Sequence, residues 1–235
     1  MIFNSLHVMI LAGGKGTRLR SVVSDRPKVM AEVSGKPFLN WILDHLHQQG
    51  VREVTLLTGY MADQIQDFYG PQYKDIQLYY SHEVVPLGTG GAVKLALERQ
   101  SQPKTICLLL NGDTYFPANL VNAITLQDSL TNTVLTSHVS DISRYGSLQI
   151  DTLSRKVLRF NEKGLTGPGF INAGTYLLES RAFLDFPQKT FSLENDLLKP
   201  LVSKGRLTAL VDKAPFIDIG IPADYANFQH IVSGR

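Results

Sequence analysis

An apolar run that ends abruptly in glycine constrains the fold of this chain more than any other feature. Val8–Ala12 is wholly apolar, and Gly13, Gly14 and Gly16 follow it directly. A short apolar run of this kind is typical of a strand buried on both faces of a parallel sheet. The glycines predict a loop whose backbone takes a positive φ or comes close to another group. Backbone N–H groups in such a loop form a concavity that can bind an anion.

Charged and hydroxyl side chains are interspersed with these glycines. Arg18 supplies a forked donor suited to phosphate, and Lys15 and Thr17 lie beside it. The loop departs from both common phosphate motifs, because Leu19 stands where a dinucleotide fingerprint needs glycine and no Walker string occurs. An ordinary strand-to-helix turn therefore stays open as an alternative.

Composition limits the domain organisation and the class of partner. With 235 residues, 43% of them hydrophobic, the chain is expected to form a single domain over residues 1–235. A net charge of +2 is too small to indicate a nucleic-acid partner. Cys107 lies in an apolar run and is predicted to be buried, and we expect neither a leader nor a membrane span in the first residues. We expect a cytoplasmic protein without membrane association; a homo-oligomer is allowed.

The remaining pattern alternates between strands and helices and predicts βαβ units. We expect strands at 53–58, 76–80, 105–110, 133–138, 147–150, 157–160, 169–178 and 207–211, and helices at 37–50, 62–69, 88–99, 117–127, 192–201 and 223–231. The short alternating strands after residue 130 are typical of antiparallel ribbons added to a parallel core. The predicted class is α/β, a Rossmann-like three-layer α/β/α sandwich with a mixed, mostly parallel central sheet. His45 and His47, on the first long helix, are expected at the surface.

Polar residues at predicted strand ends are the candidates for chemistry. Asp113 follows the strand at 105–110, where ligands bind in doubly wound sheets, so it can hold Mg²⁺ or else form an Asx-turn. Asp218 lies in an apolar run, where a carboxylate is costly unless it is paired or binds a metal. Lys28 follows Pro27 in an extended segment and is either a second cation for the same phosphates or a surface lysine.

Two further segments are candidates for ligand binding. The glycine-rich stretch 88–91 runs into a helix N-terminus, where an anion or a flat base can approach the backbone, although a loop with a glycine cap would look the same. Asn172 is a polar residue in an apolar strand and is expected to bond either the backbone or a ligand.

Taken in order, these segments resemble the sugar-1-phosphate nucleotidyltransferases over nearly the whole chain. The matching strings are Leu11–Arg18, Pro27-Lys28, Gly88–Gly91, Gly112-Asp113, Glu162-Lys163, Asn172–Gly174 and Asp218–Pro222. Within that family the strings Leu19–Val23, Arg144–Gly146, Asn111–Asp113 and Phe216–Pro222 are similar to those of D-glycero-D-manno-heptose 1-phosphate guanylyltransferases. Ser21, where many relatives have proline, weakens a thymidylyl- or uridylyltransferase interpretation without excluding it.

The resemblance implies transfer of a nucleotidyl group, GMP in the first instance, from NTP to a sugar 1-phosphate with release of pyrophosphate. It implies catalytic roles for Arg18, Lys28, Asp113 and Asp218, with Mg²⁺ on the two aspartates. It implies nucleotide binding by Leu11, Ala12, Gly13, Gly14, Gly16, Thr17, Arg18, Glu83, Gly88 and Thr89. It implies substrate binding by Lys28, Gly112, Gly146, Glu162, Lys163 and Asn172.

The nucleobase is argued from Glu83. Relatives that use thymine or uracil commonly have glutamine at this position, whereas a carboxylate offers only acceptors and suits the N1–H and N2–H₂ donors of guanine. A surface glutamate is the alternative. Competing functions are mannose-1-phosphate guanylyltransferase, another sugar-1-phosphate uridylyl- or thymidylyltransferase, and a non-catalytic regulatory subunit that binds an NDP-sugar. A nicotinamide-dependent oxidoreductase would share the fold class but lacks its fingerprint here.

Overall fold

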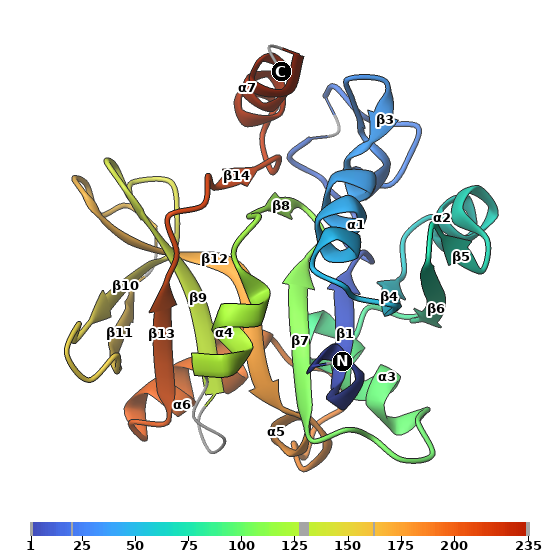
Figure 1. Cartoon of the computed structure of the whole chain (residues 1–235). Helices are drawn as coiled ribbons and strands as arrows, with labels where there is room; N and C mark the ends of the chain where they lie inside the picture. Colours follow the sequence, from blue (N-terminus) through green and yellow to red (C-terminus); the bar gives the residue numbers. More distant parts are fainter. Residues whose placement is uncertain (1, 20, 127–131, 162, 234–235) are drawn as a thin grey trace.

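A mixed sheet forms the centre of the computed structural model, which describes residues 2–19, 21–126, 132–161 and 163–233. Its strands are β1 (Leu6–Leu11), β4 (Glu53–Thr58), β5 (Gln72–Tyr73), β6 (Ile76–His82), β7 (Ile106–Asn111), β9 (Asn132–Val139), β10 (Ser147–Ile150), β11 (Val157–Asn161), β12 (Gly169–Glu179) and β13 (Leu207–Val211). The strand order is β11-β10-β12-β7-β1-β4-β6-β5, and β9 pairs with both β12 and β13 (Figure 1). The central strands β7, β1, β4 and β6 are parallel, and β10, β11 and β12 add antiparallel pairs.

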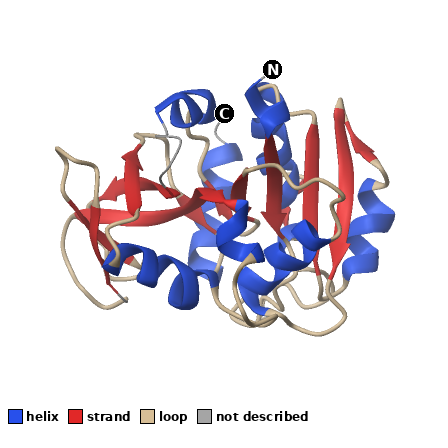
Figure 2. Cartoon of the chain, turned by 90° about the horizontal axis from the view of Figure 1, so that it is seen from below, coloured by secondary structure: helices blue, strands red, loops and turns tan. Residues whose placement is uncertain are grey.

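Helices cover both faces of this sheet (Figure 2). They are α1 (Phe38–Gln48), α2 (Ala62–Tyr69), α3 (Gly88–Glu98), α4 (Leu120–Leu126), α5 (Ser180–Leu184), α6 (Lys199–Ser203) and α7 (Pro222–Ser233), with short 3₁₀ turns η1 (Ile2–Ser5) and η2 (Lys28–Met30) and a π-helical turn η3 (Leu193–Leu198). Val8 and Ile10 of β1 pack in the core with α1, α2, α4 and α7, while Met9 packs in the core with α3, α5, α6 and η3. The period-two alternation of a strand thus builds two cores, and the predicted three-layer sandwich is confirmed.

Two small ribbons lie outside the main sheet. β2 (Glu32–Val33) pairs with β3 (Lys36–Pro37), and β8 (Thr114–Tyr115) pairs with β14 (Ile217–Asp218). The sequence pattern did not predict these two-residue strands or α5, because elements this short carry no periodicity.

Several local expectations can be compared directly with the structure. Cys107 is buried as predicted, and burial raises the pKa of its thiol to about 12. His45 was expected at the surface, and this is wrong: it is 8% exposed, and burial lowers its pKa. It lies on the inner side of α1, so its imidazole is neutral at physiological pH. His47 is half-buried, with Nε2 3.1 Å from Asp75 Oδ2.

The predicted helix at 192–201 is divided into η3 and α6. Ser192 caps its N-terminus, because Ser192 Oγ accepts from Asn195 N at 3.2 Å and Asp196 Oδ2 accepts from Ser192 N at 2.7 Å. The helix expected at 117–127 begins at Leu120, and its predicted last residue, Gln127, lies outside the described residues.

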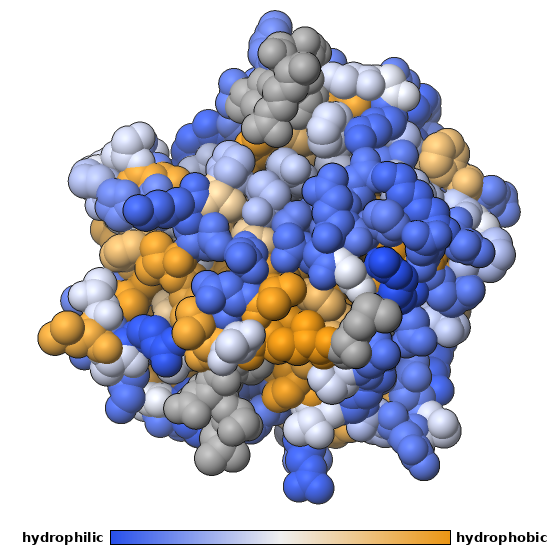
Figure 3. Space-filling model, in the orientation of Figure 1, coloured by the Kyte–Doolittle hydropathy of each residue, from blue (hydrophilic) through white to orange (hydrophobic). Residues whose placement is uncertain are grey.

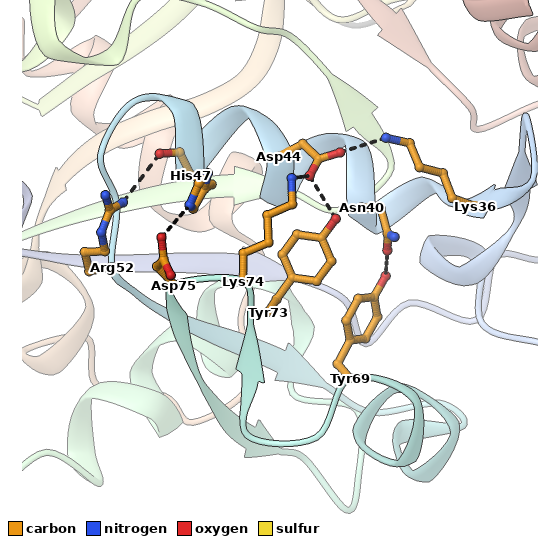
Figure 4. A network of polar contacts seen from close by, with 9 residues as sticks. All are labelled: Lys36, Asn40, Asp44, His47, Arg52, Tyr69, Tyr73, Lys74 and Asp75. Carbon is orange, nitrogen blue, oxygen red and sulfur yellow. Dashed lines mark hydrogen bonds and ion pairs between the residues drawn. The ribbon is translucent and has the colours of Figure 1, made fainter.

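A polar network fixes the outer edge of the sheet to α1 (Figure 4). Asp44 accepts from Lys36 Nζ at 2.7 Å, Tyr73 Oη at 2.8 Å and Lys74 Nζ at 2.6 Å, and Tyr69 donates to Asn40. These contacts join α1 to α2 and β5, so they stabilise the fold.

Apolar side chains gather around α4 and β13 on the face shown in Figure 3, where Val121, Leu126 and Val211 are exposed. None of the three lines the cavity described below. Among the described residues no helix is long and apolar enough to cross a membrane.

Candidate active site

A cavity of about 970 Å³ opens at the carboxyl ends of β1, β4 and β7. Among its lining residues are Leu11, Ala12, Gly13, Gly14, Lys15, Gly16, Thr17, Arg18, Lys28, Gly59, Tyr60, His82, Glu83, Gly88, Thr89, Asn111, Gly112 and Asp113. Every residue predicted to bind the nucleotide is therefore on its wall. This is where the crevice of an open α/β sheet is expected, because parallel strands all end at the same edge.

The first glycine loop is tightly packed at two of its three glycines. Gly16 has φ +59°, and an added Cβ would lie 3.0 Å from Lys28 Cβ. At Gly13 an added Cβ would lie 3.1 Å from Gly59 N and 3.2 Å from Glu83 Oε1. The loop thus needs glycine where the lysine stem and the next strand end approach it, whereas Gly14 has open space.

Lys28 is buried and paired, so it is not a surface lysine. Its Nζ donates to Asp113 Oδ2 at 2.7 Å, and its side chain is only 10% exposed. Pro27 is extended as expected, with ψ 146°, but Lys28 itself begins the 3₁₀ turn η2. The aliphatic stem lies along Gly16, and the ammonium reaches the end of β7.

Asp113 and Asp218 are brought together by the pairing of β8 with β14. Asp218 pairs with Thr114, and Ile219 N donates to Asp113 O at 2.9 Å. Gly220 N donates to Asp218 Oδ1 at 2.6 Å. Burial, and next the negative charge of Asp113, raise the pKa of Asp218, while Lys28 opposes the shift. A buried carboxylate whose ionised form is destabilised by a neighbouring carboxylate is chemically suited to share a divalent cation with that neighbour.

No third carboxylate, histidine or cysteine completes a metal site within the described part of the chain. A cation held by Asp113 and Asp218 would therefore take its remaining ligands from substrate oxygens and water, as Mg²⁺ commonly does. In place of the Asx-turn alternative, Asp113 forms the ion pair with Lys28, and it also accepts from Thr114 Oγ1 at 3.3 Å.

Comparison with known proteins identifies the family to which this site belongs. A profile described as Nucleotidyl transferase matches residues 7–233. The chain belongs to this family. Its matches include D-glycero-alpha-D-manno-heptose 1-phosphate guanylyltransferases from Aneurinibacillus thermoaerophilus (37% identical, covering 95% of this chain and 97% of the relative) and Campylobacter jejuni (38%, covering 95% and 98%). The crystal structure of HddC from Yersinia pseudotuberculosis complexed with GMP-PN superposes with a TM-score of 0.86 at 40% identity, covering 97% of this chain and 99% of HddC.

In this nucleotidyl transferase the second glycine segment is close to the protein's own backbone. An added Cβ would lie 2.5 Å from Phe191 O at Gly88, 2.2 Å from the Phe191 ring at Gly90 and 2.3 Å from Lys189 O at Gly91. The close approach at Gly90 and Gly91 is thus made by the segment before η3. Only Gly88 and Thr89 also reach the cavity, and Thr89 Oγ1 accepts from Leu193 N at 2.8 Å.

Glu83 lies on the cavity wall between the two glycine segments. Its Oε2 accepts from Leu87 N at 2.9 Å, and Oε1 faces Gly13 and Gly59. The carboxylate is therefore held in place by the backbone, which a solvated surface glutamate would not be.

Of the residues predicted to bind the sugar phosphate, Lys28 and Gly112 line the cavity, whereas Gly146, Lys163 and Asn172 lie outside its lining. An added Cβ at Gly112 would lie 2.3 Å from Leu11 O. Gly146 O accepts from Asn172 N at 3.1 Å, and Lys163 is close enough to Asp218 to influence its pKa. Glu162 lies outside the described residues. Asn172 bonds the backbone, the first of its two alternatives, because its Oδ1 accepts from Gly174 N at 3.1 Å.

The structure also reveals site residues that sequence reasoning did not single out. Lys15, Tyr60 and Asn111 line the cavity, and Tyr60 and Asn111 lie at the ends of β4 and β7. The rule that located Asp113, a polar residue at the carboxyl end of a buried strand, would have found both. Arg144 forms an ion pair with Asp224 of α7, and no local signal predicts this contact.

Proposed function

We propose that this nucleotidyl transferase transfers GMP from GTP to D-glycero-D-manno-heptose 1-phosphate, releasing pyrophosphate and giving the GDP-sugar. The observation that carries the proposal is that Arg18, Lys28, Asp113 and Glu83 line one cavity. The proposal is supported by the names of the relatives from Aneurinibacillus thermoaerophilus and Campylobacter jejuni and by the GMP-PN complex of HddC. All of residues 1–235 would act as one domain, in the cytoplasm where nucleoside triphosphates are formed.

The chemistry we propose is an in-line attack by the sugar phosphate on the α-phosphorus of GTP. The nucleophile is already an anion at neutral pH, so no general base is required. The barrier arises from bringing two anions together, and catalysis then consists of positioning and neutralisation of charge. Arg18 would neutralise the leaving pyrophosphate, Lys28 the α-phosphate, and Lys163 the sugar phosphate.

We assign Mg²⁺ to the carboxylate pair Asp113 and Asp218, whose mutual repulsion a divalent cation would relieve. When bound there, the ion supplies positive charge next to the α-phosphate and the sugar phosphate oxygen. Lys28 already compensates the charge of Asp113. Lys28 would exchange this carboxylate for a phosphate when the substrates bind.

The other roles are those that the family resemblance implies. The backbone of the first loop, from Leu11 through Ala12, Gly13, Gly14, Gly16 and Thr17, together with Gly88 and Thr89, would bind the nucleotide. Gly112, Gly146, Glu162 and Asn172 would contact the sugar phosphate.

Glu83 is proposed to select guanine. Its carboxylate is oriented by Leu87 N and lines the cavity, and it can accept hydrogen bonds from guanine N1–H and N2–H₂. The edge of uracil or thymine offers acceptors on both sides of its one donor, so a carboxylate would repel these bases.

A substrate panel tests the proposal. Pyrophosphate release is measured for each of GTP, ATP, UTP and dTTP with heptose, mannose and glucose 1-phosphates. We expect the highest kcat/KM with GTP and the heptose substrate, and a reduced preference for GTP in Glu83→Gln. Higher kcat/KM with UTP or dTTP would contradict the argument from Glu83, and a preference for mannose 1-phosphate would contradict the heptose assignment. No release with any pair would indicate the non-catalytic binding subunit.

A further inference from the structure

A network of polar side chains outside the cavity lining links Asn172 to two residues, Tyr176 and Glu194, that have no role in the chemistry above. Asn172 Nδ2 donates to Tyr176 Oη at 2.8 Å and lies 3.2 Å from Glu194 Oε1. Tyr176 is 1% exposed, whereas Glu194 is exposed. Side-chain networks of this kind orient their members, because each donor and acceptor constrains the next.

An irregularity in β12 positions Asn172 and Tyr176 in this network. The register against β9 shifts between Asn172 and Tyr176, and Gly174 in between has φ +67°. Asn172 Oδ1 binds the freed Gly174 N–H, which leaves its Nδ2 directed toward Tyr176 and Glu194. An added Cβ at Gly174 would lie 2.8 Å from the side-chain amide of Asn111, so the irregularity borders the cavity wall. Bulges commonly re-aim side chains next to active sites.

Glu194, the remaining member of the network, lies on the π-helical turn η3. Ser192 caps this turn, and Leu193 N donates to Thr89 Oγ1 on the cavity wall. Thr89 thereby ties the turn that carries Glu194 to the proposed nucleotide site. Single π-helical turns are uncommon and occur often at functional sites.

The charges of Glu194 and Asp113 both act on Tyr176. Burial raises the pKa of Tyr176, and the negative charges of Glu194 and Asp113 raise it further. The Tyr176 hydroxyl is thus within electrostatic range of both carboxylates. Asp113 and Asn111 are on the cavity wall, and Asn172 joins Glu194 to this wall through Gly174, which packs against Asn111.

We propose that Glu194, oriented by Asn172 and Tyr176, determines specificity for the sugar by binding hydroxyl groups of its ring or side chain. This inference rests on the proposed function, since it assumes that a sugar phosphate binds beside Asp113. A carboxylate has only acceptors, and adjacent hydroxyls can donate to its two oxygens together. Oε1 is within reach of Asn172, and no described residue donates to Oε2.

The same charge excludes one class of substrate. A sugar 1-phosphate that carries a second anionic group, such as a second phosphate, would place that charge near Glu194 and be repelled. The substrate class is therefore a sugar 1-phosphate whose sugar is polyhydroxylated and carries no second anionic group.

The test compares Glu194→Gln with the wild-type enzyme on mannose 1-phosphate, heptose 1-phosphate and mannose 1,6-bisphosphate. The nucleotide is whichever one the wild type uses best, so the result does not depend on the base. Loss of charge-assisted hydrogen bonds predicts a fall of roughly 10- to 100-fold in kcat/KM for the monophosphates, mainly through KM. The bisphosphate is expected to lose much less or to gain, so discrimination against it falls about tenfold or more, while KM for the nucleotide is unchanged.

Asp196→Asn is the matched control, because it removes a negative charge from the same turn. The asparagine side chain would keep an acceptor for Ser192 N, which Asp196 now binds at 2.7 Å. Discrimination that is unchanged in Glu194→Gln, or altered equally in Asp196→Asn, would overturn the inference.

Failure of the proposed function is separable from failure of this inference. If the wild type releases no pyrophosphate with any pair, the proposed function fails. Calorimetric binding of the same three sugar phosphates to the wild type and Glu194→Gln then decides the role of Glu194. Weaker monophosphate binding together with stronger bisphosphate binding supports the inference, and equal affinities refute it.

Discussion

Replacing Lys28 with methionine is expected to lower turnover by a factor of about 10²–10³. Lys28 Nζ lies 2.7 Å from Asp113 Oδ2, and the side chain is 10% exposed, so its charge acts in a poorly solvated place. Removing one preorganised group that stabilises charge in a transition state typically costs about 2.7–4 kcal/mol, which corresponds to this factor. Methionine retains an aliphatic stem against Gly16 and removes only the ammonium.

The assay is the steady-state rate of pyrophosphate release at saturating GTP, sugar phosphate and Mg²⁺, with thermal unfolding of each variant measured in parallel. The effect should appear in kcat, because the Lys28 ammonium interacts most strongly with the transition state, in which the two reacting phosphates are closest together. Turnover within tenfold of the wild type, in a variant that remains folded, would refute the argument that this ammonium neutralises the reacting phosphates.

Lys36→Met is the matched control for this variant. Lys36 forms an ion pair of the same length, 2.7 Å, with Asp44, but it lies outside the cavity. A partly exposed pair of this kind contributes up to about 1 kcal/mol to stability. We therefore expect turnover within about twofold of the wild type and a slightly lower melting temperature.

Three further outcomes follow from the geometry. Asp218→Asn should abolish activity yet stabilise the protein by about 1 kcal/mol in chemical unfolding at pH 7.5 with EDTA, because the raised pKa of Asp218 means that its ionised form destabilises the fold. The gain should vanish well below the ordinary pKa of 3.8, where the carboxyl is protonated in both the folded and the unfolded state. Chelation with EDTA should stop turnover but move the thermal midpoint by less than about 2 °C, since the protein itself pairs Asp113 with Lys28. A larger shift would show that the ion is structural. Gly90→Ala should cost about 1–3 kcal/mol, because its Cβ would lie 2.2 Å from the Phe191 ring; an unchanged denaturation midpoint in urea would contradict this packing.

Much of the fold could be predicted because its signals are local. The strand β4 and the helix α2 have the predicted bounds, since an apolar period of 2 or 3.6 residues is visible within each segment. The prediction for His45 failed for a physical reason: a helix whose buried face is wide enough takes polar residues inside, and the period alone does not show how wide that face is.

The candidate site, too, could be predicted from the sequence only in part. The first glycine loop and Asp113 follow buried strands, so their place at one edge of the sheet could be predicted. The partners of Gly90 and Gly91 could not, because the segment that approaches them is distant in sequence and has no periodic pattern. Of residues 88–91, which were predicted as a ligand cradle, Gly88 and Thr89 line the cavity and Gly90 and Gly91 do not.

By itself the sequence determined the order of strands and helices, the parallel core and the end of the sheet at which anions could bind, because these depend on apolar periodicity and on glycine at strand ends. Only the tertiary structure decided that Lys28 pairs with Asp113, that β14 brings Asp218 beside it, and that η3 brings Glu194 to Asn172. These contacts join residues far apart in the chain, so their geometry is fixed by packing of the whole sheet and leaves no trace in any local stretch of sequence.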